Sequence, residues 1–331
     1  MYDFNEIVGN EQIIKSMKSA VRHSMVSHAY IIGGADGCGK GLIAAAFAKT
    51  LLCEGGGDTA CGKCTSCRTF DGGNNPDVTY IYPTKTKALS VDDVREQITS
   101  DVNIKPYSHR YKIYIIPKAD TMTVPAQNAL LKTLEEPPEY AVFILLAENT
   151  DAFLPTILSR CVTFGIKPLS NDTVKKYLVS KGIANESDAA MFAEYSQGSI
   201  GNAVKFARSE EFNALREKIS AVLRDMGRLS YFDLTEAAKE LEAFKDLTDV
   251  TDMIYIWYRD VLVYKTTGNE SLVIEKDMLG AVKTEAERVS FDGLYAVDGL
   301  INETKRQIRQ NVNFVFAMEM LFINIKGELS K

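Results

Sequence analysis

The sequence has no long apolar segment and no excess of basic residues. None of its apolar runs approaches eighteen residues, so we expect no membrane span. The first residues, 1–6, lack a basic region followed by an apolar stretch, so we expect no secretory signal and a cytoplasmic location. A formal net charge of −6 argues against tight binding of nucleic acid by this chain alone, because phosphate-tracking proteins usually carry a basic surface.

The composition is that of an ordinary globular protein large enough for two or three domains. The chain has 331 residues, of which 46% are hydrophobic and 25% charged. Up to about Lys167, short apolar runs alternate with helical stretches, a pattern that predicts a mainly parallel sheet covered by helices on both faces. The predicted strands are Ala29–Gly33, Val78–Tyr82, Lys112–Ile116, Ala141–Ala147 and Val162–Ile166.

Beyond residue 167 the strand pattern stops. Residues 168–208 read as short helices with a Gly-containing break at Gly198-Ser199, and residues 209–331 read as helical throughout. Near the end of the chain, apolar residues follow helical spacing from Phe314 to Ile325. We therefore expect an α/β part followed by two helical parts.

A phosphate loop follows the first predicted strand. Residues 34–41 have the pattern G-x-x-x-x-G-K, in which glycines turn backbone N–H groups toward an anion at a helix N-terminus. Gly34, Gly37 and Gly39 are the glycines of this candidate site, and Lys40 is the side chain that could reach a β- or γ-phosphate. The residues leave open whether ATP or ADP still binds, or whether the turn only packs the helix against the sheet.

The two positions that would hold Mg²⁺ have lost their ligands. The Ser or Thr that should follow Lys40 is Gly41, and the strand over 112–116 ends in Pro117-Lys118 where an ATPase has Asp-Glu. Asp120 comes three residues beyond the expected acid, and we interpret it as a loop residue. Because phosphoryl transfer depends on the metal to stabilise charge, we expect no hydrolysis at this site.

Four of the six cysteines form a cluster that predicts a structural zinc site. Thiolates at these spacings suit tetrahedral Zn²⁺ with no open position for water, although an iron–sulfur cluster or free thiols remain alternatives. The ligands would be Cys53, Cys61, Cys64 and Cys67. The other two, Cys38 and Cys161, are expected to be buried thiols.

One arginine near the end of the α/β part has two interpretations. An isolated Arg is usually a surface or ion-paired residue. In a ring of phosphate-loop subunits, however, Arg160 could reach the γ-phosphate bound by a neighbour and stabilise transition-state charge.

Several segments together resemble bacterial clamp-loader subunits of the AAA+ family. They are the run AQNALLKTLEEPP at 126–138, the four-cysteine insert directly after the phosphate-loop helix, the triplet Ser159-Arg160-Cys161, and the opening residues 4–11. They cover about half of the chain in the order found in the family. The motor subunits of that family (gamma/tau) keep the loop hydroxyl, the acidic pair and a sensor Arg. Here Gly41, Pro117-Lys118 and Gly201 stand in those places, and no extension follows the last helical part, so the resemblance implies the non-hydrolysing type.

The resemblance also implies an architecture and partners. Residues 1–167 would be an AAA+ phosphate-loop core with a parallel sheet and a zinc insert, 168–208 a small helical lid domain, and 209–331 an all-α collar that joins five subunits in a ring. The protein would be no enzyme alone but part of the DNA polymerase III holoenzyme, offering Arg160, oriented by Ser159, to a neighbour's ATP. Its partners would be the gamma/tau and delta subunits, the sliding clamp, and primed DNA through the complex.

Three alternatives remain from the sequence. The chain could be a clamp-loader-like ATPase that retains nucleotide binding or slow hydrolysis through Lys40. It could also be a DNA-binding module gripping DNA with Lys63 and Arg68 beside the cysteines, although the acidic balance speaks against this. Finally, Trp257, Tyr258 and the aromatic residues near the C-terminus could form only an internal helical core rather than a contact surface.

Overall fold

The computed structural model describes residues 2–85, 88–244 and 250–329. The chain forms two compact units: the first is Met1–Leu169 together with Ser199–Gly201, and the second is Ser170–Gly198 together with Asn202–Lys331. The predicted division into three domains at 167 and 208 remains a prediction. The return of residues 199–201 to the first unit was not foreseen.

A five-stranded parallel sheet forms the centre of the first unit, in the order β2-β3-β4-β1-β5. The predicted bounds are confirmed for β1, β3 and β4, while β2 and β5 end earlier. The N–H of Ile81 still donates to the carbonyl of Ile115. The neighbouring strand β3 ends at the next residue, Ile116, so the residues after Ile81 have no strand to pair with. The strands are β1 (Ala29–Gly33), β2 (Val78–Tyr80), β3 (Lys112–Ile116), β4 (Ala141–Ala147) and β5 (Val162–Gly165).

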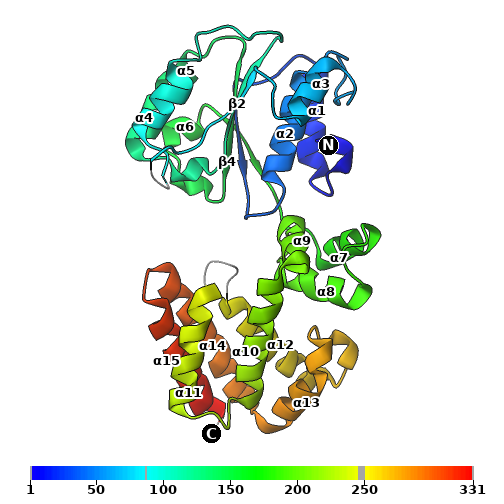
Figure 1. Ribbon diagram of the computed structural model, residues 1–331, viewed down its shortest axis with the longest axis vertical. Helices are drawn as coiled ribbons and strands as arrows, with labels where there is room; N and C mark the ends of the chain where they lie inside the picture. The colour runs from blue at the N-terminus through cyan, green and yellow to red at the C-terminus, as the bar shows by residue number, and fades with distance from the viewer. Residues whose placement is uncertain (1, 86–87, 245–249, 330–331) are drawn as a thin grey trace. The chain divides into compact units, whose positions relative to one another are not determined.

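Helices cover both faces of this sheet, as Figure 1 shows. One face packs on α1 (Glu11–Arg22), α2 (Lys40–Leu51) and α3 (Thr65–Asp71). The other packs on α4 (Val91–Val94), η2 (Arg95–Thr99), α5 (Val124–Glu135) and α6 (Pro155–Leu158). Successive residues of a strand point to opposite faces. Both faces of the inner strands β1, β3 and β4 are buried, which explains why these three read as nearly continuous apolar runs.

Two helices of this unit follow from local sequence. In α2, Ile43–Ala48 are buried, as their small and apolar side chains predict. Lys49 is buried as well and is ion-paired with Asp71 at 2.7 Å. In α5, the side chain of Thr123 accepts a hydrogen bond from the N–H of Ala126 at 3.4 Å, and Pro125 lies in the first turn where its missing N–H is harmless.

A side chain holds the segment just beyond the outer strand β2. The amide of Gln97, on η2, accepts from the N–H of Tyr82 at 3.2 Å and donates to the carbonyl of Tyr82 at 2.7 Å. This pair of bonds is what a neighbouring strand would have made.

The second unit is all helical, which confirms the predicted helical content after residue 168. Buried residues of the last helix are Ala317, Met318, Leu321, Phe322 and Ile325, the predicted spacing. Trp257 and Tyr258 are also buried, so they belong to the internal core. The helices are α7 (Asn171–Ser180), α8 (Glu186–Tyr195), α9 (Ile200–Arg208), α10 (Glu210–Asp225), α11 (Tyr231–Leu241), α12 (Val250–Thr267), α13 (Leu279–Arg288), α14 (Phe291–Arg309) and α15 (Phe314–Leu329).

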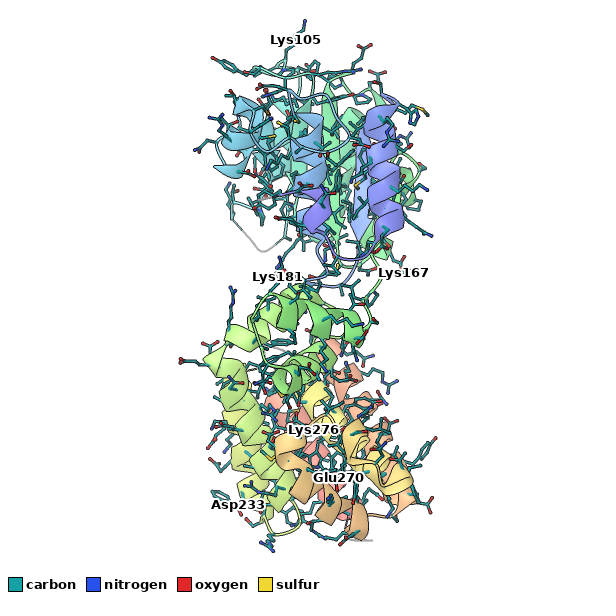
Figure 2. The ribbon with its side chains drawn as sticks, turned by 90° about the vertical axis from the view of Figure 1, so that its right-hand side faces the viewer. Lys105, Lys167, Lys181, Asp233, Glu270 and Lys276 are labelled. Carbon is teal, nitrogen blue, oxygen red and sulfur yellow. The ribbon has the colours of Figure 1, made fainter. Side chains whose placement is uncertain are left out.

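Polar contacts tie down the short connections of this unit (Figure 2). Asp233 completes a capping box with Ser230 at the start of α11, and Lys276 donates from its ammonium group to the carbonyl of Glu270. Within the residues that the structure describes, no helix has both the length and the apolar character needed to cross a membrane.

Candidate nucleotide site, arginine and metal site

The phosphate loop connects the end of β1 to the start of α2. Gly37 (φ 67°) and Gly39 (φ 95°) have left-handed backbone conformations that glycine adopts without strain. The ammonium group of Lys40 donates to the carbonyls of Gly34 at 2.6 Å and Ala35 at 2.8 Å. The predicted loop residues therefore come together, and the lysine closes over its own loop.

A pocket of about 340 Å³ opens beside this loop. It lies where β1, β3 and β4 end, the usual ligand-binding edge of a parallel sheet. In Figure 2 this is the end of the first unit marked by Lys167, opposite Lys105. The pocket is lined by Asp36, Gly37, Gly39, Lys40, Gly41, Pro117, Lys118, Leu146 and Glu148.

The residues of this pocket do not fit the magnesium ion of an ATPase. A Cβ at Gly41 would meet no atom within 4 Å, so there is room for a hydroxyl-bearing side chain but none is present. Asp120 does not line the pocket, because its Oδ2 accepts from the N–H groups of Glu148 and Asn149, both at 3.0 Å. It lies in the short 3₁₀ helix η3 (Ala119–Thr121), just before α5. Glu148, directly after β4, is the one acid near the loop that the sequence analysis overlooked, and its place after a buried strand was the signal.

Lys118 has an unusual backbone. Its φ of 51° is left-handed, which costs a residue with a Cβ about 1 kcal/mol or more. Thr121 fixes this conformation by donating to the Lys118 carbonyl from its N–H at 2.9 Å and from its hydroxyl at 2.8 Å.

Gly201 lies against the phosphate loop. Its N–H donates to the carbonyl of Gly37 at 3.0 Å, and the hydroxyl of Ser199 donates to the carbonyl of Asp36 at 3.2 Å. A Cβ at Gly201 would lie 2.6 Å from the oxygen of Gly37, so no larger residue fits without a shift of the backbone. The segment that would carry a sensor arginine in a motor subunit thus makes a backbone contact here.

Arg160 follows the short helix α6 and does not line the pocket of its own chain. Its guanidinium pairs with Glu135 at 3.0 Å and donates to the carbonyl of Thr156 at 3.0 Å and to the hydroxyl of Ser159 at 3.4 Å. Ser159 in turn donates to the Thr156 carbonyl at 3.0 Å. The arginine is thus held in one direction at a partly exposed site, with Ser159 among the groups that orient it.

His28 supports the backbone beside this arginine. Burial lowers the pKa of His28, and a hydrogen bond with the Arg160 backbone opposes that shift only in part. The Nε2 atom is buried and has no hydrogen-bond partner in the part of the chain that the structure describes. His28 is therefore neutral in the folded protein.

The four predicted zinc ligands come together in the loop between α2 and α3. Their sulfur atoms all lie within 4.8 Å of one another. Four sulfurs at about 2.3 Å from Zn²⁺ would be about 3.7 Å apart, so the donor set fits a tetrahedral ion. Backbone N–H groups of Gly55 and Cys61 point to the Cys53 sulfur at 3.4 and 3.2 Å.

The environment of these thiols differs from one to the next. Hydrogen bonds from the backbone of Lys63 and Cys64 lower the pKa of Cys61 to about 6, while burial raises the pKa of Cys53 and Cys67. Zn²⁺ would overcome these differences, because a bound thiol gives up its proton.

The remaining thiols and basic residues have simpler surroundings. Cys38 and Cys161 are half-buried, and burial raises the pKa of both, to about 12 for Cys161. Beside the zinc ligands, Arg68 donates to the carbonyl of Lys63 at 2.9 Å.

Comparisons with known proteins agree with this fold and this set of site residues. The family model described as "DNA polymerase III, delta subunit" matches residues 9–170. DNA polymerase III subunit delta' of Bacillus subtilis is 29% identical over 98% of both chains. Subunit tau of the same organism is 29% identical over 92% of this chain, which spans 58% of tau. A solved gamma subunit-related protein from Thermotoga maritima is 18% identical, with a TM-score of 0.47. The match covers 96% of this chain and 99% of that protein.

The sheet order, the phosphate loop and the cysteine insert define a phosphate-loop protein of the AAA+ class. The chain belongs to the family of DNA polymerase III clamp-loader subunits of the gamma, tau and delta' type.

Proposed function

We propose that the protein is the non-hydrolysing, delta'-type subunit of a clamp loader. In this role it completes a ring with gamma/tau and delta subunits and supplies Arg160 to the ATP bound by a neighbouring motor subunit. The ring would load a sliding clamp onto primed DNA. The similarity to the B. subtilis delta' subunit over nearly the whole length of both chains supports this role.

One observation carries the proposal: the catalytic parts are divided between places that cannot work together in one chain. The pocket has its lysine and its glycines but Gly41 and Lys118 in place of metal ligands. Arg160, the residue that could stabilise transition-state charge, lies outside that pocket in an orientation fixed by Glu135 and Ser159. An arginine of this kind is useful only to a γ-phosphate held by another chain.

The zinc site fits a structural role in this proposal. Four thiolates leave no open coordination position, so a bound Zn²⁺ would activate no water. Because the ligands follow α2 and include the first-turn residues of α3, the ion would join these two helices on one face of the sheet.

The test is the ATPase activity of the assembled complex. The purified chain is mixed with its gamma/tau and delta partners, the clamp and primed DNA, and ATP turnover is measured for the wild type and Arg160→Ala. We expect Arg160→Ala to assemble normally but to slow DNA-stimulated turnover by about tenfold or more at the neighbouring site. Unchanged turnover would make Arg160 a structural residue.

A matched control separates charge loss from catalysis. Arg22 is also an exposed arginine of the first unit and is ion-paired with Asp58. Arg22→Ala should leave turnover unchanged. Size-exclusion chromatography of each mixture verifies that the ring has formed.

The residual-ATPase alternative has its own outcome. We expect the isolated chain to show no ATP turnover above background. Turnover that disappears in Lys40→Ala would establish an active site in this chain and overturn the non-hydrolysing role.

A further inference from the structure

The end of β3 carries a cation where the metal ligands of an ATPase would be. Pro117 and Lys118 line the same pocket as Lys40 and the loop glycines. Among the described residues, the Lys118 ammonium has no hydrogen bond or ion pair. An ammonium group on a residue that lines the same pocket as a phosphate loop is an electrostatic complement to phosphate oxygens.

The position of this lysine is fixed by the backbone. Pro117 restricts φ on one side, and Thr121 holds the Lys118 carbonyl with two hydrogen bonds on the other. A non-glycine residue kept in the left-handed region at the edge of a pocket is a feature that often accompanies function. The backbone of Lys118 is therefore held at the edge of the pocket.

The same surroundings disfavour a divalent cation. Mg²⁺ demands several oxygen ligands in near-octahedral geometry. Of the acids near the loop, Asp120 is committed to backbone N–H groups, and Asp36 and Glu148 line the pocket. Both are exposed, as Lys118 is, so water screens all three charges. A Mg²⁺ ion here would also meet repulsion from Lys118.

The phosphate-binding parts themselves are intact. The loop amides lie at the start of the twelve-residue helix α2, whose N-terminus attracts anions. The Lys40 ammonium now donates only to two loop carbonyls, and a phosphate could replace one of these partners. The pocket volume of about 340 Å³ is within the usual range for small ligands.

We propose that this pocket binds the polyphosphate group of a nucleotide without a divalent cation, and that Lys118 takes the electrostatic place of the metal. The inference rests on the non-hydrolysing role proposed above and explains it further: without a metal the γ-phosphate is held but not activated. A bound nucleotide would then be a permanent part of the subunit and not a fuel.

The test is titration calorimetry of the full-length chain with ATP, once with excess EDTA and once with excess MgCl₂. We expect ATP to bind in EDTA at least as tightly as in magnesium. Lys118→Ala should weaken binding in EDTA by about fivefold or more, and Lys40→Ala should abolish it. Lys105→Ala, an exposed lysine at the opposite end of the unit, is the matched control and should bind as the wild type does.

Several outcomes would overturn the inference. They are the absence of ATP binding under both conditions, binding that requires magnesium and is lost in Glu148→Gln, and Lys118→Ala binding with unchanged affinity. Thermal unfolding of each variant verifies that it folds. Titration with tripolyphosphate distinguishes a site that binds phosphates alone from a site that also recognises the base and sugar. Tripolyphosphate and ATP both carry the polyphosphate group proposed here.

Failure of this inference can be told from failure of the proposed function. The function is tested by Arg160→Ala in the assembled complex, whereas the metal-free site is tested by calorimetry of the single chain. A chain without nucleotide could still donate Arg160, and a chain that binds ATP without metal could still lack a trans-acting arginine.

Discussion

At the scale of single residues, the direction in which a side chain points determines which groups it can contact. Arg160 is directed by Glu135 and by the hydroxyl of Ser159, which itself donates to Thr156. The pair with Glu135 is about half exposed, so it contributes little to stability, with about 1 kcal/mol as an upper figure. Its value lies in orientation, and a short rearrangement would free the guanidinium for another acceptor.

His28 gives a pH-dependent prediction at this scale. Because burial lowers its folded pKa, the unfolded chain binds the proton first as the pH falls. The stability associated with neutral His28 is therefore complete above the unfolded pKa of about 6.5 and is lost as the pH falls below it. We expect the free energy of unfolding in urea to drop between about pH 7.5 and pH 5.5, and His28→Gln to reduce that drop.

The control for the His28 prediction is the substitution of a second histidine. His23 is exposed and bonded to Ser19, so His23→Gln should leave the pH dependence as it is in the wild type. If His28→Gln and the wild type lose stability in parallel over this range, burial of the neutral imidazole does not contribute as described.

At the scale of elements, the cysteine loop and the contact on the phosphate loop each have a vulnerable position. The cysteine loop joins α2 to α3, and Cys64 is both a predicted zinc ligand and the N-cap of α3, accepting from the N–H of Cys67 at 3.4 Å. These two roles can be separated, because serine is a good N-cap but a poor zinc ligand in such a site.

Cys64→Ser should therefore keep the cap and lose the metal. We expect zinc content, measured by plasma mass spectrometry, to fall from about one ion per chain toward zero. The free energy of unfolding should fall by about 2 kcal/mol or more, because the binding energy of a structural zinc contributes to folding. Cys161→Ser, outside the cluster, should keep its zinc; a zinc-free wild type with full stability would rule the site out.

The contact between Gly201 and the phosphate loop gives another prediction. In Gly201→Ala the new Cβ would lie 2.6 Å from the oxygen and 2.9 Å from the Cα of Gly37, so the hydrogen bonds from residues 199 and 201 must lengthen or break. We expect the free energy of unfolding in urea to fall by about 1–2 kcal/mol.

Gly41→Ala is the matched control for this substitution. Its Cβ would meet nothing within 4 Å and lies on a helix, where alanine is the better residue. It should leave stability unchanged or raise it by up to about 1 kcal/mol. Equal stability of Gly201→Ala and Gly41→Ala would mean that the contact at Gly201 is not held.

The sequence predicts those features whose cause lies in residues close together in the chain. Buried strands such as Lys112–Ile116, the mostly apolar α2 and the cap at Thr123 follow from residues that are neighbours in the chain. The cysteine spacing likewise predicted which thiols would meet. By contrast, the pair Arg160–Glu135 depends on two helices lying together, and spacing along the chain does not show that.

The contact of Gly201 illustrates the same limit. The sequence shows that Gly201 stands where a motor subunit has a sensor arginine. It does not show that the backbone at Gly201 would contact the carbonyl of Gly37. That outcome depends on the packing of distant segments. For the same reason, the sequence does not show which residues of the predicted collar would face another subunit.

At the scale of the whole molecule, the second unit has an exposed apolar groove. It lies between α12 and α14, has a volume of about 360 Å³, and is lined by nine residues in all. Its most exposed aromatic residues are Tyr295, at 83% exposure, and Phe291, at 55%. Exposed aromatic clusters of this kind often mark protein interfaces.

If the predicted collar joins clamp-loader subunits, this groove is a good site for one of them. We expect the double substitution Tyr295→Ser and Phe291→Ser to weaken assembly with gamma/tau and delta subunits by about tenfold or more, without lowering the melting temperature of the isolated chain. Analytical ultracentrifugation of the mixtures measures this. A matched pair on α11, Tyr231→Ser with Phe232→Ser, should assemble normally; equal losses in both pairs would remove the groove from consideration.

The bond pair between Gln97 and Tyr82 has a consequence for how the protein behaves in crowded solution. A free sheet margin is where one chain can recruit another and where fibrils start. Tyr82 lies two residues beyond the end of β2, and one amide group occupies the N–H and the carbonyl that this residue would otherwise offer to another chain. On this side of the sheet, the segment after β2 therefore offers fewer free backbone groups for pairing between chains.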